Sequence, residues 1–164
     1  MTVEFMLDEE PVSIDVHPME TLLEILRTHL GRTATRQGCG RGECGSCQVF
    51  MDDMLVNACL VPAFRLEGKI IQTIEGFSRT KDYLDIEKAF LAKNITQCGF
   101  CVPSLVLSAQ AILQAKSAPM KHEVEDFLAG NFCLYSGLHQ VADAIIYAAQ
   151  LRRKRRDGKK GRTD

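Results

Sequence analysis

Three cysteines lie close together in a glycine-rich stretch of the first half of the chain. Cys39 and Cys44 are separated by four residues, Cys44 and Cys47 by two, and Cys59 follows twelve residues later. This C-x4-C-x2-C…C spacing is typical of a plant-type [2Fe–2S] site. Thiolates are soft, strongly donating ligands that suit iron. The spacing therefore predicts one [2Fe–2S] cluster held by these four cysteines.

Glycines alternate with the ligands in the same stretch, residues 36–47. They can adopt positive φ angles, so that successive backbone N–H groups can point at the sulfurs and stabilise their negative charge. The glycines are Gly38, Gly40, Gly42 and Gly45. A zinc site or a group of buried thiols is the alternative, but zinc sites usually combine two close C-x2-C pairs.

A second cysteine set lies in the other half of the chain. Cys98 and Cys101 form a C-x2-C pair, and Cys133 follows later. The pair alone could be a redox site, but no predicted strand precedes it, as a thioredoxin-like site would require. The three thiols are one fewer than a [2Fe–2S] cluster usually takes. Tyr135 stands two residues beyond Cys133, where a fourth ligand would be expected.

The elements that must position the first set follow from periodicity. Alternating apolar residues over 3–7 and 12–16 predict a hairpin, and Thr21 with Glu24 predicts a capped helix that ends at Gly31. Further strands are expected over 47–51, 54–57 and 69–74, with Asp52 and Asp53 as turn residues. Residues 1–76 are therefore expected to form an α+β domain, with residues 76–79 as a linker.

The second half has a helical period instead. Helices are expected over 82–93, 104–116, 122–128 and 138–151, with Leu84, Phe90 and Leu91 among the core positions. These segments predict a four-helix bundle over residues 80–151. The second cysteine set then lies where helix pairs begin and end.

Charge is distributed unevenly along the 164 residues. Residues 152–164 contain eight basic and two acidic residues, which leaves 12 basic and 19 acidic residues in the preceding part. A disordered basic tail is expected there, with docking to an acidic partner as the next interpretation. No aromatic residue interrupts the run, so nucleic-acid binding is not favoured.

Composition limits the classes of protein further. The hydrophobic fraction is 46%, and no stretch approaches the ~18 apolar residues of a membrane span. We therefore expect a cytoplasmic protein whose seven cysteines are reduced rather than paired. The chain contains no G-x-G-x-x-G motif and no P-loop, so flavin and nucleotide sites are expected on other chains.

Both cysteine sets, in this order, resemble the iron–sulfur subunit of the molybdenum hydroxylases, the xanthine dehydrogenase family. The resemblance covers about residues 3–150. It implies a β-grasp ferredoxin-like domain with one cluster and a helical-bundle domain with another. The implied ligands are Cys39, Cys44, Cys47 and Cys59 in the first domain and Cys98, Cys101 and Cys133 in the second. Gln97 would reach toward the pterin of a partner subunit.

The sequence departs from the family pattern at Tyr135, where the family has cysteine. A phenol has a pKa of about 10 and is a harder ligand than a thiol, so it suits iron in such a cluster less well. Several outcomes remain open. Tyr135 could bind iron, as a tyrosine does in catalase; Ser136, His139 or a non-protein ligand could replace it; or the second cluster could be weakened or lost.

The resemblance implies an electron-transfer subunit with no catalytic residues of its own. Electrons would pass from a molybdopterin-binding large subunit, through the [2Fe–2S] clusters, to the FAD of a medium subunit, and then to NAD or another acceptor. The alternative is a docking or regulatory module that one cluster or a zinc ion stabilises, without a complete relay.

Overall fold

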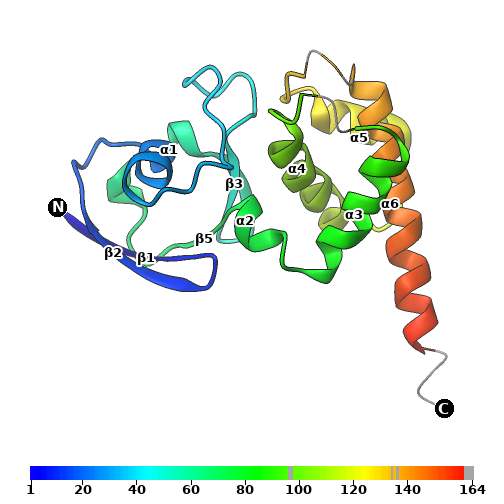
Figure 1. Ribbon diagram of the computed structural model, residues 1–164, viewed down its shortest axis with the longest axis horizontal. Coiled ribbons are helices and arrows are strands. Elements are labelled where there is room, and N and C mark those ends of the chain that lie inside the picture. Colours follow the sequence, from blue (N-terminus) through cyan, green and yellow to red (C-terminus); the bar gives the residue numbers. More distant parts are fainter. Residues whose placement is uncertain (96–97, 134, 136, 161–164) are drawn as a thin grey trace.

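The computed structural model describes residues 1–95, 98–133, 135 and 137–160, with side chains as far as residue 158. A mixed sheet with short helices forms the N-terminal half, and the C-terminal half is helical (Figure 1). The α+β arrangement expected from the sequence is confirmed. Among the described residues, no helix has the length and apolar character needed to cross a membrane.

Five strands form the sheet in the order β2-β1-β5-β3-β4. β1 and β5 run parallel, and the other neighbouring strands are antiparallel. The strands are β1 (Thr2–Leu7), β2 (Glu10–Asp15), β3 (Gln48–Met51), β4 (Met54–Asn57) and β5 (Ile70–Gln72). β5 ends earlier than expected because Thr73 is the N-cap of a following helix and its hydroxyl accepts from Glu75 N–H.

Both predicted hairpins are present, and each turns through two acidic residues. Asp8 and Glu9 have φ angles of 51° and 72°, and Asp52 and Asp53 have φ angles of 48° and 65°. Two consecutive residues with positive φ match the right-handed twist of the flanking strands. Asp52 and Asp53 are therefore turn residues, as predicted.

The predicted capped helix begins as α1 (Leu22–Glu24) and continues as a π-helical segment η1 (Ile25–His29). Its capping box is complete: Thr21 N–H donates to Glu24 Oε2 at 2.7 Å, and Glu24 N–H donates to the Thr21 hydroxyl at 3.3 Å. The apolar face of this segment is buried in the core of the sheet half. The cysteine loop follows this segment in the chain.

In the part of the helical half that the structure describes, the four predicted helices are present together with one additional short helix. They are α2 (Ile74–Phe77), α3 (Lys81–Ala92), α4 (Val102–Ala115), α5 (Lys121–Leu128) and α6 (Gly137–Lys160). The expected linker is wrong in part, because residues 76 and 77 belong to α2 and Phe77 is buried. Leu84 and Leu91 are exposed rather than in the core, whereas Phe90 is buried as expected.

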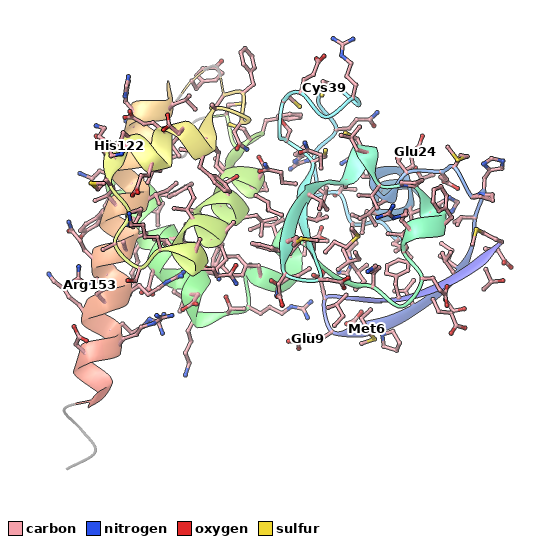
Figure 2. The ribbon with its side chains drawn as sticks, turned by 180° about the vertical axis from the view of Figure 1, so that it is seen from behind. Met6, Glu9, Glu24, Cys39, His122 and Arg153 are labelled. Atoms are coloured by element: carbon pink, nitrogen blue, oxygen red, sulfur yellow. The ribbon has the colours of Figure 1, made fainter. Side chains whose placement is uncertain are left out.

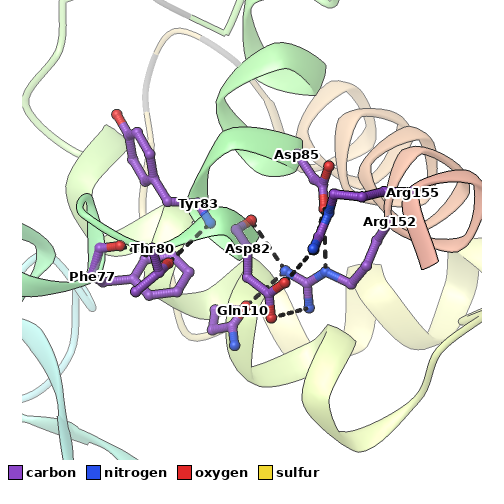
Figure 3. A network of polar contacts seen from close by, with 8 residues as sticks. All are labelled: Phe77, Thr80, Asp82, Tyr83, Asp85, Gln110, Arg152 and Arg155. Atoms are coloured by element: carbon purple, nitrogen blue, oxygen red, sulfur yellow. Dashed lines mark hydrogen bonds and ion pairs between the residues drawn. The ribbon is translucent and has the colours of Figure 1, made fainter. Parts of the chain in front are cut away.

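The basic segment is also different from the prediction. Residues 152–160 are not disordered but continue α6, and residues 161–164 lie outside the described part. Arg152 is buried and donates to Gln110 Oε1 at 2.8 Å, and Arg155 donates to Asp85 Oδ2 at 2.8 Å (Figure 3). These bonds tie the end of α6 to α3 and α4. Hydrogen bonds to Asp85 and Asp82 raise the pKa of Arg155.

Each half has its own apolar core, and the two halves meet along α4. Phe50 on β3 is buried in the core of the helical half, with Leu55 on β4 packed against it. β3 begins directly after Cys47, and α4 begins directly after Cys101. The elements that join the two halves are therefore the elements that carry the cysteines.

Candidate metal centre

The first cysteine set lies on an irregular loop and on a short turn beside it. Cys47 directly precedes β3, and Cys59 lies in the 3-10 turn η2 (Ala58–Leu60). The two are joined by the β3–β4 hairpin, where Ala58 N–H donates to Cys47 O at 3.1 Å. Cys47 and Cys59 are buried, whereas Cys39 and Cys44 are partly exposed. Cys39 lies on the outer loop beside the sheet half (Figure 2). None of the cysteines in the described part forms a disulfide.

Backbone N–H groups of the loop point at its sulfurs. Arg41 and Glu43 N–H groups donate to Cys39 Sγ at 3.5 and 3.2 Å, and Cys39 N–H donates to Cys44 Sγ at 3.3 Å. Hydrogen bonds from backbone N–H groups to a sulfur favour its thiolate form, and those that the Arg41 and Cys44 N–H groups donate to Cys39 are the main causes that lower the pKa of Cys39 to about 6. This is the arrangement expected around an anionic cluster.

The loop conformation depends on its glycines in two ways. Gly40, Gly42 and Gly45 have φ angles of 69°, 81° and 69°, as predicted. Gly38 does not have a positive φ; it is needed for space, because a Cβ there would lie 2.6 Å from Cys44 Sγ.

The donor set fits a [2Fe–2S] cluster. Four thiols lie on two neighbouring segments, and backbone donors are already directed at two of the sulfurs. Burial raises the pKa of Cys47 to about 12, so binding of iron there must displace a proton. Among the described residues, no group of three or more His, Cys, Asp or Glu side chains is arranged to hold a single metal ion. A two-iron cluster instead spreads four thiolates over two ions.

The second set is gathered at the start of α4. Cys101 is the N-cap of α4, and its Sγ lies 2.8 Å from Cys133 Sγ. Cys98 is exposed and has a φ of 62°, which is uncommon for a residue with a side chain. Burial, followed by the neighbouring Cys133, raises the pKa of Cys101 to about 12.

The second set has three cysteines and lacks a fourth thiol ligand. Tyr135 is 65% exposed. His139, one of the alternatives, instead places Nδ1 2.7 Å from Glu125 Oε1. Gln97 and Ser136, which the sequence also singled out, lie outside the described residues.

Cys39 and Cys44 of the first set and all three cysteines of the second set line one hollow of about 340 Å³, which the sequence did not reveal. Its wall is mostly apolar and includes exposed aromatic side chains at its rim. The lining residues are Gly38, Cys39, Cys44, Ser46, Cys98, Phe100, Cys101, Phe132, Cys133 and Tyr135. The exposed side of the first set, Cys39 and Cys44, therefore opens onto the same space as the second set, although the sequence places the two sets on separate halves.

Comparison with known protein families gives one match in each half. Residues 5–69 match the 2Fe-2S iron-sulfur cluster binding domain, and residues 73–146 match the [2Fe-2S] binding domain. The fold is also found in solved structures. The quinoline 2-oxidoreductase structure from Pseudomonas putida 86 contains a chain that is 33% identical, with a TM-score of 0.86 and coverage of 93% of this chain and 96% of that chain.

Curated relatives fall into two size classes. A nicotinate dehydrogenase subunit of Pseudomonas putida is 30% identical over 93% of this chain and 98% of its own length. The nicotinate dehydrogenase small FeS subunit of Eubacterium barkeri is 31% identical over 92% and 96%. Xanthine dehydrogenase of Emericella nidulans is 36% identical over 87% of this chain, but the match spans only 11% of that protein. The chain therefore belongs to the xanthine dehydrogenase family, as an iron–sulfur, electron-transfer subunit.

Proposed function

We propose that the chain relays electrons between two partners in a molybdenum hydroxylase, a large subunit that binds molybdopterin and a medium subunit that binds FAD. The observation that supports this proposal most strongly is the shared hollow, because Cys39 and Cys44 of the first set line the same space as the second set, which suits the passage of electrons between the sets. The substrate is oxidised on another chain, and this chain has no catalytic residue in the proposal.

The proposed ligands of the first cluster are Cys39, Cys44, Cys47 and Cys59. This cluster supplies a one-electron redox centre when bound. The chain's contribution is to hold the four sulfurs, to direct N–H groups at them, and to exclude water on the side of the buried thiols. The domain that carries it is proposed to be a β-grasp domain over residues 1–76.

The proposed ligands of the second cluster are Cys98, Cys101 and Cys133. The N-terminal end of α4 follows Cys101 directly and favours negative charge there. With Tyr135 in place of a fourth thiol, we expect weaker retention of iron at this site. The carrying domain is proposed to be a four-helix bundle of α3, α4, α5 and α6, and Gln97 to approach the partner's pterin.

Co-purification tests the proposed assembly. The chain would be expressed with its natural neighbours, and the purified complex would be analysed for molybdopterin and flavin. We expect both cofactors to accompany the chain. Isolation of the chain without either cofactor, in a folded and iron-loaded state, would exclude the relay and favour the docking module.

A further inference from the structure

We propose that Gln48, Ser108 and Asn131 are positioning residues that hold the two cysteine sets in a fixed relative arrangement. This inference rests on the proposed relay, and it assigns a task to three side chains that are not ligands. We call the three side chains the boundary network, because they join the sheet half to the helical half.

Each member of the boundary network is close in sequence to a cysteine of the site. Gln48 directly follows Cys47 at the start of β3, and Asn131 precedes Cys133 by two residues. Ser108 lies on α4, about two turns after Cys101. A contact among the three therefore constrains segments that carry cysteines from both sets.

The hydrogen bonds of the network cross the boundary. The Ser108 hydroxyl donates to Gln48 Oε1 at 2.7 Å, and Asn131 Nδ2 donates to the same oxygen at 2.9 Å. The Ser108 hydroxyl also lies 3.2 Å from Asn131 Oδ1. One acceptor on the sheet half thus binds two donors from the helical half.

Burial makes this network costly to break. Ser108 is 0% exposed and Asn131 is 6% exposed. Buried polar groups that lose their partners carry a desolvation penalty, which water cannot relieve while the halves stay in contact. Separation or sliding of the halves is therefore opposed by polar as well as apolar contacts.

The backbone beside the network makes the connection tighter. Phe132 N–H donates to Cys44 O at 2.9 Å, which joins a cysteine of the first set to the residue directly before Cys133. A Cβ at Gly45 would lie 2.7 Å from Gly130 O and 2.8 Å from Asn131 Nδ2. Glycine therefore permits an approach that a side chain at this position would prevent.

The functional consequence is a fixed separation between the two sets. Electron exchange between two centres becomes steeply slower as their distance grows, so a loose boundary would slow the relay while each set stayed intact. Gln48, Ser108 and Asn131 would then affect transfer between the sets without binding iron or a partner cofactor.

Hydrogen–deuterium exchange of the full, iron-loaded chain tests this proposal. Asn131→Ala should raise the exchange rate of the Phe132 amide about tenfold or more, because one network member and its bonds are lost. The matched control is Ser104→Ala, which removes another buried hydroxyl of α4 whose bond, to Cys101 O at 2.9 Å, stays within the helical half. The control should leave the Phe132 amide unchanged.

A merely stabilising role gives a different pattern. It would raise exchange at Phe132 and at the Leu107 amide inside α4 in the same proportion, and that outcome, or no change at Phe132, overturns the proposal. If Asn131→Ala does not fold, Ser108→Ala provides the same comparison. Iron bound by the first set should be retained in both variants. Failure of the chain to associate with molybdopterin or flavin subunits would refute the relay but would leave this exchange result interpretable.

Discussion

Removal of the Asp85 carboxylate is expected to destabilise the chain strongly. Asp85 is buried on α3, and its Oδ2 accepts from Arg155 Nε at 2.8 Å. The same oxygen lies 3.9 Å from Arg152 Nε, and the Arg152 side chain is only 5% exposed. Figure 3 shows both arginines beside Asp82 and Asp85. Asp85→Ala therefore leaves a buried guanidinium with less compensating charge.

The size of the expected destabilisation depends on the ion pairs that Arg152 and Arg155 keep after Asp85 is removed. Breaking a buried ion pair typically costs about 3–5 kcal/mol, because the remaining charge stays buried. Asp82 still pairs with Arg155 and lies 3.8 Å from Arg152 Nη1, so the lower end of that range applies. We expect a loss of about 3 kcal/mol in the free energy of unfolding, or a fall of roughly 6–12 °C in Tm.

Urea unfolding followed by far-UV circular dichroism measures this loss. The control is Asp143→Ala, which removes a half-exposed acid that pairs with Lys121 at 2.7 Å. Exposed pairs contribute little, so the control should lose less than about 1 kcal/mol. A loss below about 1 kcal/mol for Asp85→Ala, or equal losses in both variants, would refute the stabilising role assigned to the ion pairs of Asp85 with Arg152 and Arg155.

Three further outcomes are expected. Tyr135→Cys should raise iron per chain, because it supplies the fourth thiol of the second set; unchanged iron content would count against a ligand gap there. Cys44→Ser should abolish the first cluster and disorder its loop, measured by iron analysis and proteolysis, and a fully loaded, folded variant would disprove the ligand assignment. Glu123→Gln should destabilise the chain at neutral pH but not in acid, as thermal unfolding at several pH values would show. The side-chain hydrogen bond from Lys116 lowers the pKa of Glu123, so its contribution is complete above the usual value of 4.5 and is lost as the pH falls through the lowered value. A difference that is independent of pH would contradict this.

Local patterns in the sequence predicted the sheet half well. The hairpin through Asp52 and Asp53, the capping box of Thr21 and Glu24, and the start of each long helix all depend on neighbours in sequence. The spacing of the first cysteine set likewise predicts a loop, because the geometry of that loop depends on residues that are close in sequence. Such features are visible without knowledge of the tertiary structure.

Features set by distant contacts were missed. The basic run after Leu151 resembles a solvated tail, but Arg152 donates to the Asp82 carbonyl and Arg155 to the Asp85 carboxylate, both on α3 and about 70 residues earlier in the chain. These contacts hold the continued helix against α3. The approach of Gly45 to Asn131, beside the hollow that Cys39 and Cys44 share with the second cysteine set, has no counterpart in the periodicity of the sequence. Hydrogen bonds across a domain boundary, such as those of the boundary network, leave no pattern in the local sequence.

Iron and acid-labile sulfide per chain, with EPR of the dithionite-reduced protein, test the central assignment most directly. The four thiols of the first set predict at least about two irons and two sulfides per chain, and an EPR signal of a reduced [2Fe–2S] cluster that Cys44→Ser removes. About four irons and a second signal would show that the second set also assembles despite Tyr135. Zinc in place of iron, absence of sulfide, or a signal that survives Cys44→Ser would contradict the assignment.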